Sequence, residues 1–350
     1  MRKWLVIVSI LVCNLWDSIS FSQTSEESNN KEFNILFYNT ENLYDTFDDT
    51  LTNDNDFLPR GKMHWTKAKY ELKLNNISKV FLSTGIEPPA IIGLAEIENK
   101  KVLYDLCHKT PLEKFDYKII HINSPDKRGI DVGFLYQSSI FEPINKEYIR
   151  INFETDSSRK TRDIIYIKGV ISHSDTIHLF FNHWPSRLGG EIESQGSRAF
   201  VAHKLHQKAD SVFAHSTNPN IVIMGDFNDE PDNESLLHVL NALPDTMNVK
   251  NNKLYNLSYY WLKNIVNIGT HKYKGKWAIL DQIIVSSNML KPSKNRIFCK
   301  AGFASIVSEN FLLQEDNVYG GIKPFRTYSG FKYMGGYSDH LPIVLKVTKN

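Results

Sequence analysis

The chain from Phe33 onward alternates short apolar runs with amphipathic segments. The runs at 33–38 (FNILFY) and 91–94 (IIGL) each predict a buried strand. The residues after Thr66 predict a helix that this threonine could cap. Apolar side chains recur there at helical spacing, at Tyr70, Leu74, Ile77 and Phe81.

The rest of the chain continues this alternation. A helix is predicted at Ser197–His215, and helices that alternate with strands indicate a layered α/β or α+β protein. Three neighbouring strands have no helix between them, so we expect a mixed sheet rather than a purely parallel one. The further predicted strands are Tyr117–Ile122, Asp131–Tyr136, Ile164–Ile171, Thr176–Asn182, Ile221–Met224, Leu280–Val285 and Leu341–Val347.

Polar side chains stand where the predicted strands end. Loops converge at strand ends in layered folds, so binding and catalytic sites gather there. Single residues have plain structural explanations: GDFND at 225–229 is rich in turn formers, and Glu96 could cap a helix, with Glu98 competing for its role. It is harder to attribute to chance that so many polar residues stand at predicted strand ends in one chain. The set is Asn39, Glu96, His183, Asp226, Asn228, Asp281, Asp339 and His340.

These residue types fit the hydrolysis of a phosphate ester. Mg²⁺ prefers oxygen ligands and takes one or two carboxylates, which Asn39, Glu96 and Asp339 could supply. A cation bound to a phosphoryl oxygen makes phosphorus more electrophilic. The attacking water needs a base and a second group to orient it, and Asp226 with Asn228 on one tight loop suits that role.

Histidines would complete such a site. The transition state gains negative charge, and His183 and His340 fit as cationic donors because imidazole titrates near neutral pH. A carboxylate beside an imidazole fixes its tautomer and favours its charged form. Asp281 is the candidate partner of His340.

Composition narrows the class of protein. The 350 residues are 41% hydrophobic and 23% charged, with a formal net charge of +2, which excludes a disordered chain. Three cysteines are too few for a disulfide scaffold. The balanced charge favours neither a dedicated nucleic-acid binder nor a membrane-surface protein. Cys107 and Cys299 could pair in an oxidising compartment, but we expect them to be buried bystanders.

The first 22 residues predict a secretory signal peptide. Two basic residues precede an apolar run from Trp4 to Leu15, and small residues flank Phe21 before a cleavage point after Ser22. A retained anchor is the alternative, although the run is short for a transmembrane span. Residues 23–32 are polar without periodicity and predict a tether. A cleaved signal implies a secreted or periplasmic protein.

Several sequence blocks together resemble the endonuclease/exonuclease/phosphatase superfamily, the fold of deoxyribonuclease I. They are FYNTENLYD, GLAEIENK, RGIDVGFLY, NHWPSR, GDFND, LDQIIVS and YSDHLPI, and the match runs from about Phe33 to Lys349. The resemblance implies a four-layer α/β sandwich, with two mixed β-sheets packed face to face and helices outside. It implies a single domain at 33–350, which hydrolyses a phosphodiester by in-line attack of water with Mg²⁺ or Mn²⁺ and no covalent intermediate.

The resemblance also assigns roles to individual residues. The metal-binding Glu of the superfamily falls on Glu96, in LAEI where L-Q-E-V is usual. His183 resembles the first catalytic His of the deoxyribonuclease I and sphingomyelinase branches, whereas apurinic endonucleases carry Tyr near that place. Arg162 resembles the phosphate-contacting Arg of deoxyribonuclease I, with Arg159 and Arg128 as competitors. The other family positions match as a set: Asn39, Asp226, Asn228, Asp281, Ser338, Asp339 and His340.

The catalytic residues do not fix the substrate, because the superfamily spans nucleases, sphingomyelinases and inositol phosphatases. Residues 250–277 interleave lysines with aromatic residues such as Tyr273, which suits either a polyanion with bases or a surface loop with core aromatics. Arg187, close to His183 in sequence, could contact a phosphate or form a turn. We expect a monomeric nuclease with no obligate protein partner. A phospholipid or small-phosphate esterase and a non-catalytic binding module are the alternatives.

An acidic stretch follows the first predicted strand. Residues 45–56 carry five aspartates and could bind a structural Ca²⁺. The stretch lacks the glycine and the final glutamate of an EF-hand loop, so a solvated acidic loop is the alternative.

Overall fold

The computed structural model describes residues 32–153, 159–171, 175–264 and 268–349. The predicted signal peptide and all but the last residue of the predicted tether lie outside these ranges. That last residue, Glu32, begins the first strand. Within the described ranges, no helix is long and apolar enough to cross a membrane.

The first sheet has seven strands and is built around the N-terminal strand. β1 (Glu32–Leu43) pairs in parallel with β2 (Ile91–Ile97) and antiparallel with β20 (Ile343–Lys349). Four strands extend its edges: β14 (Ile297–Phe298) and β15 (Ala304–Ile306) beside β20, and β4 (Asp131–Gln137) and then β3 (Tyr117–His121) beyond β2.

The second sheet also has seven strands. Its central strands β7 (Asp175–His183) and β8 (Asn220–Asp226) are parallel, and β8 pairs antiparallel with β13 (Asp281–Ser286). The outer strands are β6 (Ile164–Ile171) and β5 (Phe141–Ile149) on one side, and β10 (Leu254–Asn256) and β9 (Ala242–Leu243) on the other. Both sheets are therefore mixed, as predicted.

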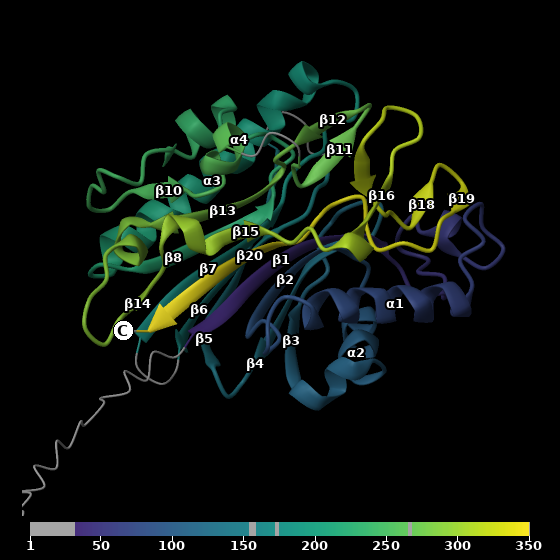
Figure 1. Ribbon diagram of the computed structural model, residues 1–350, viewed down its shortest axis with the longest axis horizontal. Coiled ribbons are helices and arrows are strands. Elements are labelled where there is room, and N and C mark those ends of the chain that lie inside the picture. The colour runs from purple at the N-terminus through teal and green to yellow at the C-terminus, as the bar shows by residue number, and fades with distance from the viewer. Residues whose placement is uncertain (1–31, 154–158, 172–174, 265–267, 350) are drawn as a thin grey trace, which may run out of the picture.

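Helices cover the outer face of each sheet, which gives the layers visible in Figure 1. α1 (Lys67–Leu82) and α2 (Lys100–His108) pack on the first sheet through a buried cluster that includes Phe81. α3 (Glu191–His215) packs on the second sheet through a cluster that includes Leu205. The predicted four-layer α/β sandwich is confirmed.

A third cluster of buried side chains fills the space between the two sheets. Phe37 of β1 and Phe181 of β7 stack there, with ring centroids 6.4 Å apart. Gly93 of β2 permits this close approach, because a Cβ at this position would lie 2.0 Å from a ring carbon of Phe181. The two sheets share one apolar core, which holds their strand ends in fixed positions.

Short elements fill the connections. Two-stranded hairpins join β11 (His271–Tyr273) with β12 (Lys276–Ala278), β16 (Leu313–Glu315) with β17 (Ile322–Pro324), and β18 (Tyr328–Ser329) with β19 (Lys332–Tyr333). Figure 1 shows these hairpins toward the same end of the sandwich. The remaining elements are α4 (Tyr259–Asn264) and helical turns at Asn55–Phe57, Pro111–Phe115, Ser235–Val239, Ser287–Leu290, Ala301–Phe303 and Asn310–Leu312.

Most predicted elements appear close to their expected bounds. Thr66 is the N-cap residue of α1, but its side chain makes no capping hydrogen bond. Several predicted boundaries are wrong. β1 and β2 end at Leu43 and Ile97 rather than at Tyr38 and Leu94. α3 begins at Glu191 rather than Ser197, because its first turns are polar, and the last strand begins at Ile343 rather than Leu341. The N–H of Leu341 donates to a loop carbonyl at 2.7 Å instead of a strand partner.

Cys107 and Cys299 are both buried and free. Cys107 lies in the cluster between the first sheet and its helices, whereas Cys299 lies in the core between the sheets. Burial raises the pKa of each thiol to about 12. The expectation that both cysteines are buried is confirmed.

Candidate active site

Strand ends from both sheets meet at one end of the sandwich. In the first sheet β1 and β2 are parallel, and Asn39 is in register with the residue before Glu96, so the two side chains emerge from neighbouring strands. In the second sheet His183 of β7, Asp226 of β8 and Asp281 of β13 are in register across three neighbouring strands. The topology thus brings together residues that are far apart in the sequence.

The segment at 338–340 joins them from the C-terminal side. Because β20 is antiparallel to β1, the start of β20 lies beside the end of β1. Ser338 Oγ donates to the carbonyl of Asn39 at 2.7 Å and accepts the N–H of His340 at 3.1 Å. These two bonds fix the turn that carries Asp339 and His340.

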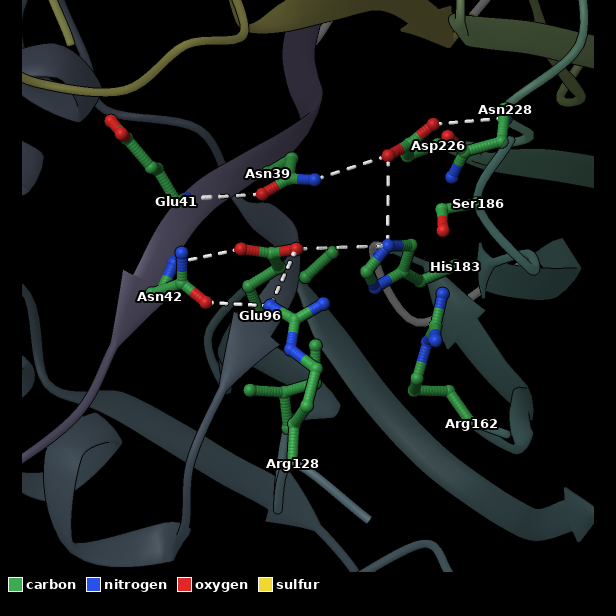
Figure 2. Close-up of polar contacts among 12 residues, drawn as sticks. Asn39, Glu41, Asn42, Glu96, Arg128, Arg162, His183, Ser186, Asp226 and Asn228 are labelled. Carbon is green, nitrogen blue, oxygen red and sulfur yellow. Dashed lines mark hydrogen bonds and ion pairs between the residues drawn. The ribbon is translucent and has the colours of Figure 1, made fainter. Parts of the chain in front are cut away.

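Asp226 is the centre of the polar contacts between the two sheets (Figure 2). Asn39 Nδ2 donates to Asp226 Oδ2 at 3.1 Å, from one sheet to the other. The same oxygen lies 3.6 Å from His183 Nε2 and 3.8 Å from His340 Nε2. The other oxygen, Oδ1, accepts the N–H of Asn228 at 2.9 Å. The structure therefore gathers the predicted catalytic residues around one carboxylate.

The surroundings of Asp226 change its acidity. The residue is 1% exposed, and burial raises the pKa of its carboxyl to about 7. The charge of His340 opposes this effect of burial, and the charge of Asp281 adds to it. A base is most effective when its pKa lies near the working pH. Asp226 is therefore suited to accept a proton from water.

His340 is held by a buried carboxylate. Its Nδ1 lies 2.7 Å from Oδ2 of Asp281. Burial disfavours the imidazolium, but the charges of Asp281 and Asp226 outweigh burial and hold the pKa of His340 well above its usual value. His340 is therefore a cation at neutral pH.

His183 does not carry the charge that we expected. Burial, together with the positive charges of Arg162 and Arg128, holds the pKa of His183 well below its usual value. The expectation of a cationic donor here is wrong, because the imidazole is neutral at neutral pH. A neutral ring still offers one donor and one acceptor nitrogen. Its Nε2 lies 3.6 Å from Asp226 and 4.0 Å from Glu96.

The residues predicted to hold a metal lie around the same centre. Glu96 has a φ of +60°, an uncommon conformation outside glycine, and its Oε2 accepts the N–H of Asn42 at 2.8 Å. Asp339 Oδ2 accepts a guanidinium hydrogen bond from Arg326 at 2.9 Å. The oxygen donors of these two carboxylates and of Asn39 fit a hard divalent cation such as Mg²⁺ or Mn²⁺.

Two groups of three side chains in the described ranges place possible metal-ligand atoms within 4.8 Å of one another. Glu96 belongs to neither group, so a cation bound to Glu96 would keep water molecules in its shell, as Mg²⁺ commonly does. One group contains His271, a residue that the sequence analysis did not single out. The groups are Asp226, Asp281 and His340, and His271, Asp339 and His340.

Arg162, the predicted phosphate contact, is largely enclosed. Its guanidinium lies 3.0 Å from Asp126 and donates to the carbonyl of Trp184 at 2.6 Å. Arg128, its competitor, has a side chain that is 47% exposed and lies 3.3 Å from Oε1 of Glu96. Figure 2 shows both guanidinium groups near the site, and that of Arg128 is the more accessible.

The other two predicted substrate contacts differ in role. Arg187 Nε donates to the carbonyl of Asn228 at 2.7 Å, so it supports the loop that carries Asp226. Tyr273 is 65% exposed on β11. Within the aromatic and basic segment at 250–277, of which residues 265–267 lie outside the described ranges, Tyr255 and Trp261 are buried in the core. Some aromatic residues of this segment are therefore core residues, whereas Tyr273 is exposed.

Glu98, which competed with Glu96 for the metal role, faces the acidic stretch instead. Its Oε2 accepts the N–H of Asp45 at 2.6 Å. One oxygen of Glu98 and one of Asp54 are buried without a hydrogen-bond partner. These residues form neither of the two ligand groups above, and the structural Ca²⁺ site stays a prediction.

A charged cluster behind Asp339 was missed by the sequence analysis. Glu41 of β1, with a φ of +51°, accepts Nε of Arg326 at 3.2 Å and the N–H of Thr327 at 2.7 Å. Lys73 of α1 donates to the hydroxyl of Thr327. Burial, with the charge of Asp339 adding to it, raises the pKa of Glu41 to about 7. The predicted first strand ended at residue 38, before Glu41, so the sequence did not place this carboxylate in a buried strand, where a charge requires partners.

Comparison with known proteins agrees with this arrangement. A family model described as "Endonuclease/Exonuclease/phosphatase family" matches residues 34–349. The chain belongs to this family. The superfamily consists of phosphoester hydrolases, and its enzymes use divalent metal ions. No curated protein sequence matches the chain.

Solved structures share the fold over nearly the whole length of both chains. An endonuclease/exonuclease/phosphatase family protein from Bacteroides thetaiotaomicron has 13% identity and a TM-score of 0.56, over 92% of this chain and 99% of that one. D. rerio TDP2 complexed with single-strand DNA product has 14% identity and a TM-score of 0.52, over 90% and 98%. A mannosyl-6-phosphatase from B. thetaiotaomicron has 14% identity and a TM-score of 0.55, over 90% and 99%.

Proposed function

We propose that this member of the family is a secreted, Mg²⁺- or Mn²⁺-dependent phosphodiesterase that hydrolyses nucleic-acid phosphodiester bonds and acts as a monomer. The observation that carries the proposal is the buried carboxyl of Asp226, with its pKa near 7, set between His183, His340 and Asn39. Such a carboxyl suits activation of water more than a structural role. Secretion is supported by the predicted signal peptide at 1–22.

Asp226 accepts the proton of the attacking water in this proposal. The Nδ2 of Asn39 and the N–H of Asn228 donate to opposite oxygens of the carboxylate, at 3.1 and 2.9 Å, and so fix its plane. The Nδ2 of Asn228 donates to the carbonyl of Trp184 at 3.1 Å, which holds the loop. Water oxygen bonds to phosphorus, its proton passes to Asp226, and the bond to the leaving oxygen breaks.

Positive charge is available for the transition state. The imidazolium of His340, kept charged by Asp281, can stabilise a phosphoryl oxygen or protonate the leaving oxygen. The accessible guanidinium of Arg128 can contact another phosphoryl oxygen in bidentate fashion. The neutral imidazole of His183 adds a hydrogen-bonding group beside Asp226.

Asn39, Glu96 and Asp339 would hold the metal. When bound, Mg²⁺ or Mn²⁺ neutralises a phosphoryl oxygen and makes phosphorus more electrophilic. The chain itself orients the donors, since Glu96 is fixed by a backbone N–H at 2.8 Å and Asp339 by Arg326 at 2.9 Å.

Nucleic acid is the substrate class that the accessible groups favour. The exposed ring of Tyr273 lies on the same short strand as His271, whose ring centroid is 4.7 Å from that of His340. Exposed rings and cations near the site suit the bases and phosphates of a single strand. D. rerio TDP2, complexed with single-strand DNA product, supports this class, whereas the mannosyl-6-phosphatase supports a small phosphate ester as the second candidate.

A substrate panel tests the proposal. The purified chain with Mg²⁺ is assayed on single-stranded DNA, plasmid DNA, RNA, sphingomyelin, phosphatidylcholine, inositol phosphates and mannose 6-phosphate. We expect nucleic acid to be cleaved fastest, with less than about a tenth of that turnover in Asp226→Ala. Cleavage of a lipid or small phosphate alone would reassign the substrate, and no cleavage of any would favour a binding module.

A further inference from the structure

His340 also belongs to the second group of metal-ligating side chains. Its partners are Asp339 and His271 of β11, and ligand atoms of the three lie within 4.8 Å of one another. His271 and Asp339 are partly exposed, so an ion can reach the group from solvent. The proposed phosphodiester chemistry uses Asp339 and His340 but gives no role to His271.

The backbone holds His271 in place. An isolated β-bridge pairs His271 with His340, and their ring centroids are 4.7 Å apart. The carbonyl of Thr270 accepts the N–H of the residue after His340 at 2.7 Å. On the other side, Lys272 forms an ion pair with Asp316 at 2.9 Å. These contacts fix the β11–β12 hairpin, and so they hold the imidazole of His271 beside Asp339 and His340.

The group also has the outer contacts typical of a metal site. Ligating imidazoles usually bond to a carboxylate through the nitrogen that does not bind the ion. Asp281 Oδ2 lies 2.7 Å from His340 Nδ1, which leaves Nε2 for an ion. Arg326 holds Asp339 through a hydrogen bond of 2.9 Å. Two of the three side chains are therefore oriented by buried or half-buried neighbours.

The donor atoms of His271, Asp339 and His340 favour a different ion from the one that the oxygen donors of Asn39 and Glu96 favour. Imidazole nitrogen suits zinc and neighbouring transition metals, whereas Mg²⁺ prefers oxygen. Two imidazoles with one carboxylate and an open position is a pattern that zinc adopts in proteins. Ligand atoms about 2.0–2.1 Å from one zinc ion stand roughly 3.4 Å apart. The group, with its atoms within 4.8 Å, needs only small side-chain movements to reach that spacing.

We propose that His271, Asp339 and His340 form a zinc site whose occupation stops hydrolysis. This inference rests on the proposed function, because the inhibition follows from the roles given to His340 and Asp339. Zinc bound to His340 replaces the proton on Nε2 and so removes the acid that faces the phosphate. It also occupies Asp339, a predicted ligand of Mg²⁺. Zinc binds a nitrogen and oxygen set more tightly than Mn²⁺ does, so it acts in the presence of the activating metal.

Calorimetry of the untagged full chain in Mg²⁺ buffer tests the site. Zinc is titrated into wild type, His271→Gln and the matched control His203→Gln, which removes an exposed histidine of α3. We expect one zinc per chain in wild type and control, and at least about tenfold weaker binding in His271→Gln. Co²⁺, whose visible bands report imidazole ligation, should lose those bands in the same variant. Equal zinc affinity and equal Co²⁺ bands in His271→Gln and wild type would overturn the site.

Hydrolysis tests the inhibition. Each variant is assayed with Mg²⁺ before and after addition of zinc, so that it serves as its own reference. Wild type and His203→Gln should lose most of their turnover, and His271→Gln should keep it at the same zinc concentration. Equal inhibition of wild type and His271→Gln would overturn the regulatory role. If no phosphoester is cleaved, the proposed function fails, and the calorimetric and Co²⁺ measurements still decide the zinc site.

Discussion

Replacing Asp281 with Asn isolates the contribution of the buried carboxylate behind His340. The two side chains are 2.7 Å apart, with Asp281 0% and His340 7% exposed. Asn keeps the shape but removes the charge that favours the imidazolium. A hydrogen bond to a charged group contributes about 1.5–3 kcal/mol, which at about 1.36 kcal/mol per unit corresponds to about 1–2 pKa units. The pKa of His340 should therefore fall by about that amount.

The assay is Mg²⁺-dependent hydrolysis of bis(p-nitrophenyl) phosphate across a range of pH. Activity is lost on the alkaline side where His340 loses its proton, so a lower pKa moves this limb toward acid. We expect a shift of about 1–2 pH units and, because the lost interaction amounts to about 1.5–3 kcal/mol, a fall in the maximal kcat of about 10–100-fold. A kcat within about twofold of wild type, with an unchanged alkaline limb, would refute the role of the pair.

Asp175→Asn is the matched control. Asp175 is a buried aspartate at the start of β7, and its Oδ2 accepts Nε of Arg296 at 2.9 Å. His183 ends the same strand, about 26 Å away at about 3.3 Å per residue. This variant should lose stability and keep the wild-type pH profile. A shifted alkaline limb in the control would show that the shift does not report the contact behind His340.

Arg128→Ala should lower kcat/KM about 10–100-fold, because a charged contact to phosphate contributes about 1.5–3 kcal/mol. The control Arg159→Ala removes an exposed guanidinium and should leave kcat/KM unchanged. Equal kcat/KM values in the two variants would argue against a contact between Arg128 and phosphate. Gly93→Ala should lower the free energy of unfolding in urea by about 1–3 kcal/mol, because its Cβ would lie 2.0 Å from a facing ring carbon. Gly196→Ala in α3, where nothing lies within 4 Å of the new Cβ, should raise that free energy by about 0.5–1 kcal/mol, and effects of the same sign would contradict the packing argument. Burial lowers the pKa of His178 to about 4, so the unfolded chain binds the extra proton and stability falls as pH drops from 6.5 to 4. His178→Gln should flatten this dependence in urea unfolding, and an unchanged slope would disprove the assignment.

The strands that build the site could be predicted because each is a continuous apolar run. β1, β2, β7 and β8 lie inside their sheets and are buried on both faces, so hydrophobicity alone marks them. β5 is an edge strand with exposed polar residues and Pro143, and no apolar run marks it. The hairpins between 271 and 333 have strands of two or three residues, which tertiary contacts rather than a local pattern define.

The centre of the site could be predicted for the same reason. Asn39, His183 and Asp226 follow or end apolar strands, and strand register then brings them together. Residues supplied by irregular segments could not be found this way. Arg326 reaches Asp339 from the connection between β17 and β18, where no periodic pattern exists.

The charge states at the site also depend on the fold. Sequence suggested that both His183 and His340 would be cations. Burial and the charges of Arg128 and Arg162 keep His183 neutral, whereas Asp281 keeps His340 charged. The pKa values of the two histidines differ because of neighbours that are remote in sequence, so residue type alone does not predict the charge state.

A Mg²⁺ titration of the metal-free chain tests whether hydrolysis depends on a divalent metal held by Glu96. Hydrolysis of single-stranded DNA is followed as Mg²⁺ is returned to chelator-treated wild type, Glu96→Gln and the control Glu113→Gln, which changes an exposed glutamate. We expect no turnover without metal, equal restoration of turnover in wild type and control, and a Mg²⁺ requirement at least about tenfold higher in Glu96→Gln. Full turnover in chelator, or the same Mg²⁺ dependence in Glu96→Gln and wild type, would contradict the role of Glu96 as a ligand of the catalytic metal.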